Sequence, residues 1–262
     1  STKNYQLDLS LTNCYQTNEV KDLGGAQPIY DPFDINVIKE GLPKHAFYTN
    51  KVIGALFNED GTYAGVDVED ERSFLGNPIP DYTGSFSMNF RFLKNFNLYL
   101  LTDWATGHKI FNNTKLFAIY LGSAFGIGAN NKRYKELEDF LDIADWDTTE
   151  APLTPDTPEY KDAANEYAKM DRKYDANFLE KADFFKLREI SLSYSFKDLL
   201  PERIGISDLV LGISARNIYT STSYSGADVE VNFDGSRSLC RGQDFLTLQQ
   251  PKVYNIWLRM SF

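Results

Sequence analysis

The sequence is short of the residues that most often carry out chemistry. It has two histidines, His45 and His108, and two cysteines, Cys14 and Cys240, each pair far apart. This spacing predicts neither a disulfide framework nor a metal site, and it favours turn or rim positions for the histidines. Phosphate-binding loops, nucleophile elbows and zinc spacings are also missing. We therefore expect no catalytic residue, no metal and no cofactor, and a chain that is not an enzyme.

Positive charge and long apolar runs are also scarce. The chain has 27 Lys and Arg against 37 Asp and Glu, a net charge of −10, which argues against nucleic acid as a partner. No apolar run reaches the roughly 18 residues of a membrane-spanning helix, since the longest, 116–129, is short and broken by glycine. Residues 1–13 do not resemble a signal peptide. Either a signal has been removed or the chain is part of a longer protein.

What the sequence has in abundance is aromatic residues and strict alternation, above all at its C-terminus. The apolar residues there fall on every second position: Tyr254, Ile256, Leu258, Met260 and Phe262. A period of two places them on one face of a strand, with Asn255, Trp257 and Arg259 on the other. The pattern fits a strand between lipid and a watery lumen, and equally the last strand of a soluble sandwich. A terminal aromatic is also similar to the assembly signal of bacterial outer-membrane proteins.

The connections between strands decide between these alternatives. Further alternation predicts strands at 5–13, 35–39, 47–57, 82–93, 96–105, 182–196 and 209–219, making seven or eight in all. From the fourth strand on, the connections run short (94–95), long (106–181), short (197–208) and long (220–250). Transmembrane barrels have short periplasmic turns and long extracellular loops. The sequence therefore favours a barrel, with 106–181 and 220–250 outside and the short connections in the periplasm.

The long loop 106–181 has features of its own. Helical spacing predicts short helices at 132–143 and 160–171, which we interpret as caps on the loop. Trp146, between Asp145 and Asp147, is a candidate ligand contact because an indole can stack on a sugar ring. The alternatives are a solvated loop, or a surface glycosidase that uses the two carboxylates.

The acidic run 65–78 contains Asp67, Glu69, Asp70 and Glu71. It lacks the spacing of a calcium loop, so we predict a solvated acidic loop there.

Five stretches, in the right order, resemble one known family. They are KEGLPKHAFYTNKVIGALFNEDG (39–61), LGNPIPDYTGSFSMNFRF (75–92), ADFFKLREISLSYSF (182–196), SARNIYTSTSYSGADVEVN (214–232) and QPKVYNIWLRMSF (250–262). Together they resemble the C-terminal part of the SusC-like TonB-dependent outer-membrane transporters of Bacteroidetes. His45 and Tyr48 to Asn50 depart from the family by replacing small residues.

The resemblance implies an all-β chain, an antiparallel transmembrane β-barrel segment of about seven or eight strands with long extracellular loops that contain short helices. Residues 1–262 would be the C-terminal part of one barrel in the bacterial outer membrane, without the plug and the N-terminal strands. The implied function is import of oligosaccharides or peptides. The implied partners are a SusD-like surface lipoprotein, TonB through the plug, the remaining barrel strands and outer-membrane lipid. The alternative is a small self-contained barrel with a structural or adhesive role.

Overall fold

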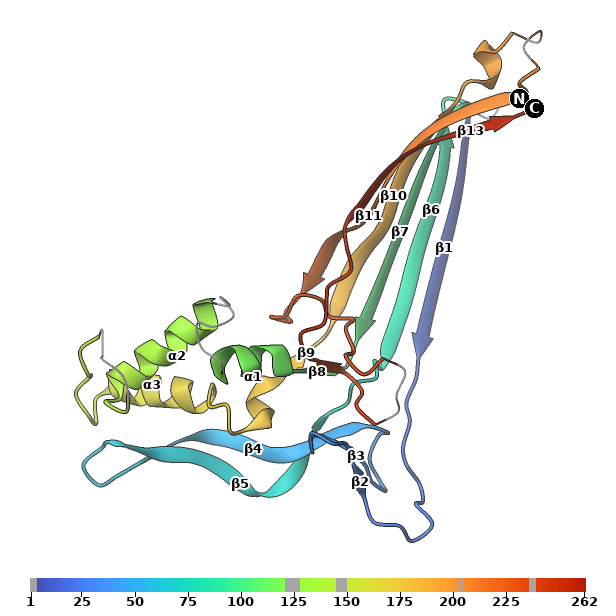
Figure 1. The fold of residues 1–262 in the computed structure, drawn as a ribbon. Coiled ribbons are helices and arrows are strands. Elements are labelled where there is room, and N and C mark those ends of the chain that lie inside the picture. Colours follow the sequence, from blue (N-terminus) through green and yellow to red (C-terminus); the bar gives the residue numbers. More distant parts are fainter. Residues whose placement is uncertain (1–3, 121–127, 145–149, 202, 204, 236–238) are drawn as a thin grey trace.

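The computed structural model describes residues 4–120, 128–144, 150–201, 203, 205–235 and 239–262. A long curved sheet extends away from a mass of short strands and helices at one of its ends (Figure 1). Among the helices that the structure describes, none combines the length and the apolar character needed to cross a bilayer.

The long sheet, which we call the wall, has six antiparallel strands in the order β1-β6-β7-β10-β11-β13. Their bounds are β1 Tyr5–Tyr15, β6 Tyr82–Phe92, β7 Phe96–Thr106, β10 Phe184–Ser195, β11 Asp208–Thr222 and β13 Val253–Ser261. Each was predicted from its alternation, and the antiparallel barrel-segment fold is confirmed. The predicted strands at 35–39 and 47–57 belong to a separate sheet, so the wall has six strands rather than seven or eight.

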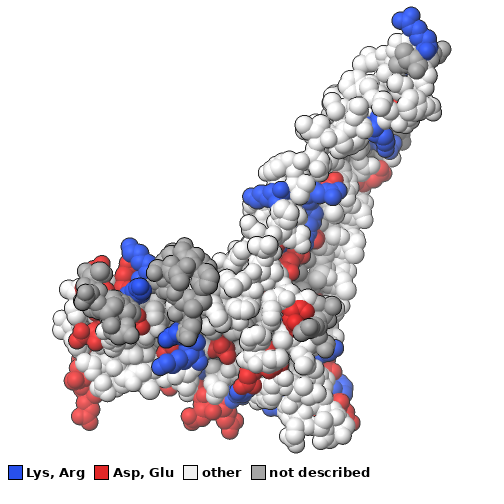
Figure 2. Space-filling view, in the orientation of Figure 1, with Lys and Arg blue, Asp and Glu red and all other residues white. Residues whose placement is uncertain are grey.

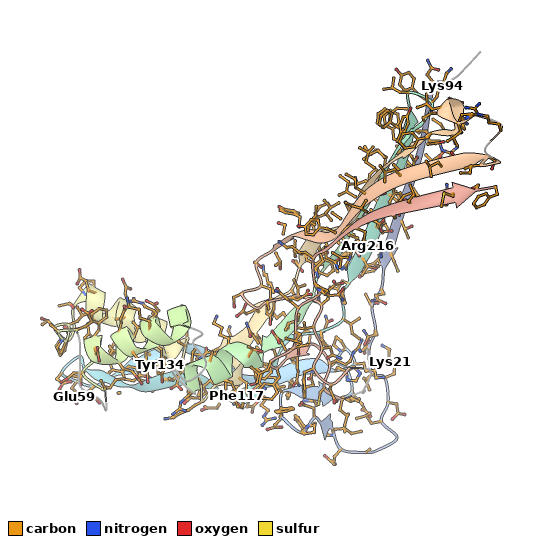
Figure 3. All side chains as sticks on the ribbon, turned by 45° about the horizontal axis from the view of Figure 1, so that its top comes forward. Lys21, Glu59, Lys94, Phe117, Tyr134 and Arg216 are labelled. Carbon is orange, nitrogen blue, oxygen red and sulfur yellow. The ribbon has the colours of Figure 1, made fainter. Side chains whose placement is uncertain are left out.

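The wall is open, with β1 and β13 at its opposite edges. A small barrel complete in itself would pair these two strands, so the structure does not support the self-contained alternative. The connections between the wall strands differ in length at the two ends of the sheet. The short ones, 93–95 and 196–207, lie at one end, with the 3₁₀ turn η3 (Lys197–Leu199) in the second. Lys94 marks that end in Figure 3, far from the helices.

We call the mass at the other end the cap; it consists of the three long connections 16–81, 107–183 and 223–252. One of its sheets contains β2 Ile29–Tyr30, β3 Asn36–Ile38, β4 Ala46–Phe57 and β5 Tyr63–Gly76. Another contains β12 Gln243–Asp244, β8 Lys109–Asn112 and β9 Leu179–Lys181. The helices are α1 Asn113–Tyr120, α2 Gly128–Phe140 and α3 Pro158–Ala168, followed by the 3₁₀ turn η2 Asp175–Phe178.

The main hydrophobic core lies in the cap, where the helices cover β4. Its fully buried side chains include Ile35, Phe47, Phe111, Leu137, Tyr160 and Phe178. Thr157 caps α3, accepting a hydrogen bond from the Tyr160 N–H, and Pro158 occupies the first turn, where its missing donor costs nothing. Gly54 lets α3 approach β4 closely, because a Cβ there would lie 2.7 Å from Asn165 Oδ1. The helices are thus part of a packed unit.

Two sequence predictions for the cap need correction, and one helix was missed. The acidic run 65–78 is not a solvated loop, since most of it forms β5, which pairs with β4 across the turn at 58–62. The helices predicted at 132–143 and 160–171 exist as α2 and α3, and each begins earlier than predicted. Helix α1 was not predicted at all.

Gly212 in β11 offers a test of the wall's packing. It pairs with Trp257 of β13, and a Cβ built on it would overlap the indole ring. We expect Gly212→Val to lower the free energy of unfolding in detergent by about 1–3 kcal/mol, because Trp257 would have to move. Ser214→Val, at the next position on the same face, is the control and should cost less. Adding Trp257→Ala should remove most of the Gly212→Val penalty, and an additive double variant would contradict this packing.

Candidate functional site

The outer face of the wall is apolar across all six strands. Because the register is continuous, residues from successive strands form rows that cross the sheet. One row is Leu7, Phe90, Leu98, Leu192, Ile213 and Ile256, and the next is Leu9, Met88, Leu100, Ile190, Ala215 and Tyr254. None of these side chains is buried, and those on the edge strands are the most exposed, with Leu7 at 54% and Ile256 at 80%. A soluble sandwich would bury such a face, so this sheet needs an apolar surrounding.

Aromatic side chains border this apolar face at both ends. Near the short connections, the ring of Phe92 stacks on that of Phe96 at 5.2 Å, and Phe96 contacts Tyr194 at 4.7 Å. Near the cap, the rings of Tyr15 and Tyr82 lie 4.6 Å apart. Strand β1 runs from one band to the other over 11 residues. At ~3.4 Å per residue and a tilt of about 40°, the bands lie roughly 26 Å apart along a membrane normal, close to the apolar belt of outer-membrane barrels.

The inner face is polar along the same strands. One of its rows is Asp8, Asn89, Tyr99, Ser191, Ser214 and Asn255. Arg216 and Glu189 pair across it, with Nε 2.9 Å from Oε2. Such a face is compatible with water or with a polar protein surface inside a barrel. Figure 2 shows wide areas of the wall free of charge, while acidic side chains gather along the lower margin of the cap.

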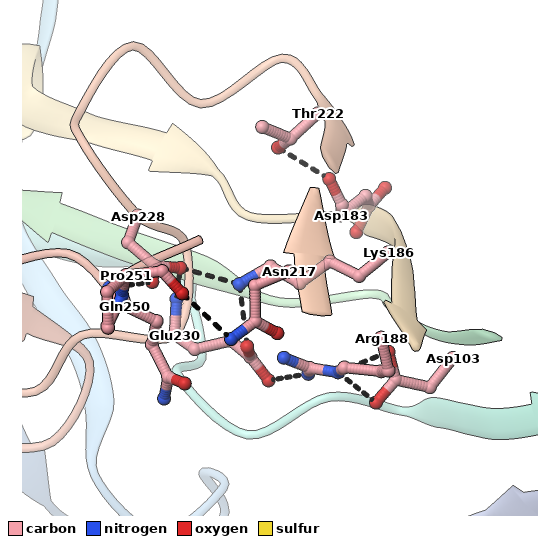
Figure 4. Close-up of polar contacts among 10 residues, drawn as sticks. All are labelled: Asp103, Asp183, Lys186, Arg188, Asn217, Thr222, Asp228, Glu230, Gln250 and Pro251. Atoms are coloured by element: carbon pink, nitrogen blue, oxygen red, sulfur yellow. Dashed lines mark hydrogen bonds and ion pairs between the residues drawn. The ribbon is translucent and has the colours of Figure 1, made fainter. Parts of the chain in front are cut away.

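An ion-pair network joins the inner face to the connection 223–252, which we call the mouth segment (Figure 4). Lys186 Nζ lies 2.6 Å from both Asp228 Oδ1 and Glu230 Oε2, and the side chains of Lys186 and Asp228 are only 5% and 7% exposed. The register of β10 shifts between Leu187 and Glu189, and Arg188 in this bulge pairs with Asp103 and Glu230. Lys186 and Arg188, two positions apart on β10, thus hold the same loop, and the register shift brings Glu189 onto the inner face as well.

The electrostatics of the network favour charged carboxylates. Burial raises the pKa of Asp228, but hydrogen bonds from Lys186 and from the backbone N–H groups of Gln250 and Glu230 outweigh it. The pKa of Asp228 therefore lies below its ordinary value. Burial likewise raises the pKa of Glu230, and its bonds to Arg188 and Lys186 reverse the shift. Both acids stay ionised at neutral pH and hold the mouth segment against the wall.

The mouth segment is also tied to the rest of the cap. Gln243 is fully buried and donates to Asp31 Oδ2 at 2.8 Å and to Asn36 Oδ1 at 2.6 Å. Asp244 accepts hydrogen bonds from Thr114 and from the Tyr224 hydroxyl, the latter at 2.7 Å. One segment therefore connects the wall, helix α1 and the sheet of β2 to β5.

A cavity of about 640 Å³ lies where the inner face meets the mouth segment. Its polar and aromatic lining includes Thr12, Ser85, Asp103, His108, Phe184 and Glu230. His108 is 7% exposed, and within the described residues no hydrogen bond reaches its Nδ1. Burial lowers the pKa of His108, although the nearby Asp183, Asp81 and Glu230 act in the opposite direction. The imidazole is therefore neutral at physiological pH.

The structure places the predicted site residues as follows. Tyr254, Ile256, Leu258 and Met260 lie on the outer face of β13, and Phe262 follows the strand, 87% exposed. Their role as an assembly signal stays a prediction. Trp146, with its neighbours Asp145 and Asp147, lies outside the described residues.

The histidines and cysteines are also placed. His45 lies in a turn with φ 64° and His108 at the rim of the wall, as predicted, but both are buried. Cys14 is exposed, Cys240 is buried, and both are free. In the described ranges, no group of three or more His, Cys, Asp or Glu side chains could hold a metal ion. Sequence reasoning missed the network of Lys186, Arg188 and the mouth segment.

The fold and the two faces of the wall define an outer-membrane β-barrel segment. No protein-family profile matches the chain. TonB-dependent receptor P3 of Formosa agariphila is 25% identical over 196 residues, which are 73% of this chain and 17% of that protein. TonB-dependent receptor P39 of the same organism is 26% identical over 220 residues, 82% of this chain and 20% of that protein. The chain thus spans a fifth or less of these curated relatives.

Solved structures of similar fold point the same way. The RagAB peptide importer in its 'closed-closed' state matches with a TM-score of 0.69 and 19% identity, covering 100% of this chain and 28% of that chain. Its 'open-open' state matches with a TM-score of 0.66 and 18% identity, covering 100% and 27%. These similarities confirm the resemblance of the chain to a barrel portion of the SusC-like TonB-dependent outer-membrane transporters. The relatives are named as receptors and importers rather than as enzymes.

Proposed function

We propose that this chain supplies the wall and mouth of a TonB-dependent importer that carries oligosaccharides or peptides across the outer membrane. The observation that carries the proposal is the two-faced wall, apolar and banded by aromatics outside and polar inside, with every long connection at one end. A polar inner face joined to a cavity at the mouth suits the passage of a polar solute. Trp146, in the connection 107–183, is proposed as a further ligand contact.

The proposed partners follow from the resemblance and from the open wall. Strands β1 and β13 stand at its edges, and unpaired amides in lipid cost several kcal/mol each. Further strands, from the same protein or another chain, would pair with both edges and complete the barrel. A SusD-like surface lipoprotein would cover the cap, TonB would act through the plug of the full protein, and lipid would contact the outer face. Tyr254 to Phe262 would be read as the assembly signal.

The orientation of the wall across the outer membrane can be tested by cysteine labelling on intact cells. We infer that the long connections, including 106–181 and 220–250, are extracellular, and that 94–95 and 197–208 are periplasmic. In a Cys14→Ser background, Pro155→Cys in the cap should react with an impermeant maleimide on intact cells. Pro201→Cys, near η3, should react only after lysis, which also serves as the control for its accessibility. Labelling of position 201 but not 155 on intact cells would overturn the orientation, and with it the proposed mouth.

A further inference from the structure

The outer face of the wall is hollowed where β10, β11 and β13 lie side by side. A groove of about 510 Å³ runs across these strands and reaches β7. The large apolar residues that form its sides all belong to the outer face: Leu98, Ile190, Leu192, Ile213, Tyr254 and Ile256. None of the described residues that line this groove is charged.

A short side chain makes the hollow. Ala215 of β11 also lines the groove, and it lies directly between Ile190 of β10 and Tyr254 of β13 in the register of the wall. Along β11 itself, Ile213 is the next residue on the same face. The single methyl group of Ala215 is therefore framed by three much longer side chains. The depression that results is open on the outer face of the sheet.

The place of the groove in the membrane limits what can fill it. The outer face of a transmembrane barrel contacts lipid. The strand that completes the barrel pairs with the edge of β13 in the plane of the sheet, so it leaves this face open. Water is a poor occupant, because an apolar cavity offers it no hydrogen bonds. An acyl chain of the bilayer both reaches the groove and matches its lining.

The groove has one polar end. Tyr254 is the second residue of β13 and is 71% exposed, so it lies at the end of this strand nearer the cap. Leu98 and Ile256 belong to the next row, farther from the cap. A tyrosine at the edge of the apolar belt can keep its ring in the apolar region while its hydroxyl donates to a lipid carbonyl. A chain that begins at Tyr254 can therefore extend along the groove toward the bilayer centre.

We propose that this groove holds one acyl chain of a membrane lipid from the leaflet nearer the cap. The chain lies over Ala215, and the Tyr254 hydroxyl donates a hydrogen bond to the carbonyl that joins the chain to its headgroup. Because the lining carries no charge, the site recognises the chain and not the headgroup. The inference needs only the membrane location of the wall, and it is independent of the solute that is imported.

Native mass spectrometry of the purified full-length transporter, titrated with lipid in detergent, tests the proposal. The probes are dipalmitoyl phosphatidylethanolamine, dipalmitoyl phosphatidylglycerol and the short-chain dihexanoyl phosphatidylethanolamine. We expect the first lipid bound to show the same affinity within about threefold for the two palmitoyl headgroups, and an affinity at least about tenfold weaker for the short chains. A headgroup preference above about tenfold, or equal binding of the short-chain lipid, would overturn the proposal.

Variants locate the bound chain. Ala215→Phe fills the hollow and should weaken the first palmitoyl lipid about tenfold, the effect of losing about two buried methylene groups. Leu211→Phe is the matched control, because Leu211 lies on the same face of β11 outside the groove, and its affinity should match the wild type. Tyr254→Phe removes only the hydroxyl and should weaken binding several-fold, which keeps the site testable should Ala215→Phe fail to fold. Unchanged affinity in the folded variants would refute the site.

A second copy of this chain is the competing occupant of the groove. Light scattering in detergent distinguishes it from lipid, because filling an acyl-chain site leaves the number of subunits unchanged. We therefore expect Ala215→Phe and wild type to have the same protein mass. A change in subunit number with unchanged lipid affinity would make the groove an interface between copies and overturn the proposal.

Discussion

Replacing Lys186 with methionine should lower the free energy of unfolding by roughly 3–5 kcal/mol, the cost of breaking a buried ion pair from one side. The side chain is 5% exposed and is bonded to Asp228 and Glu230. Without the ammonium, Asp228 would hold a buried charge whose main compensation is gone. Denaturant unfolding of the full-length transporter in detergent measures the loss. Limited proteolysis should show the mouth segment released first, since this network ties it to the wall.

Two comparisons make this result specific. Arg216→Met removes an exposed pair with Glu189 on the same inner face, where the arginine is 55% exposed, and should cost below about 1 kcal/mol. Adding Asp228→Asn and Glu230→Gln to Lys186→Met should restore much of the stability, because no buried charge then lacks a partner. If Lys186→Met costs no more than Arg216→Met, water reaches the network and the anchor is weak.

Leu258→Arg should lower the free energy of unfolding by roughly 2–4 kcal/mol if the residue lies near the bilayer midplane. Leu258 pairs with Leu211 on the outer face and is 58% exposed there. An arginine at this position would be placed against lipid. Asn255→Arg is the matched control on the opposite face of the same strand, where a charge meets a polar lumen, and it should cost less than about 1 kcal/mol. Unfolding after refolding into lipid vesicles compares the two, and equal losses would contradict the assignment of faces.

Deleting Phe262 should have the reverse effect of Leu258→Arg. The residue lies beyond the end of β13 and is 87% exposed, so little apolar area is lost on its removal. If it belongs to the assembly signal, its deletion should reduce the amount of protein in the outer membrane and leave the unfolding midpoint nearly unchanged. A deletion variant that assembles normally but unfolds far earlier would make Phe262 a packing residue.

The strands of the wall could be predicted from the sequence because each of them has an apolar surrounding on one face and a polar one on the other. Where lipid meets one face and polar groups the other, every second residue is constrained, as in β13 and β6. Strand β5 carries the same kind of signal in weaker form. Val66 and Val68 alternate with Asp67 and Glu69, and Asp60-Gly61 is a hairpin turn signal, with Gly61 at φ 80°. The density of acids in this run masked the alternation.

The candidate site was much less predictable than the wall. Lys186 and Asp228 are 42 residues apart, and only the folding of the mouth segment back onto the wall brings them together. The sequence places Lys186 and Arg188 two positions apart, as it does Asp228 and Glu230, but alternation alone does not say which strand meets which loop. The bulge in β10 matters as well, because it brings Glu189, three positions after Lys186, onto the same inner face, and no residue type announces it. Burial of His108 likewise depends on contacts between distant segments.

The core of the cap has a consequence for the order of events during biogenesis. Ile35 and Phe47 come from the connection before β6, whereas Leu137, Tyr160 and Phe178 come from the one after β7. Gln243, from a third connection, completes the contacts of Asp31. Contacts so far apart in sequence form late, because the intervening chain must be placed first. We therefore expect the cap to close only after the strands between its pieces are in place, and its resistance to proteases would mark a finished wall.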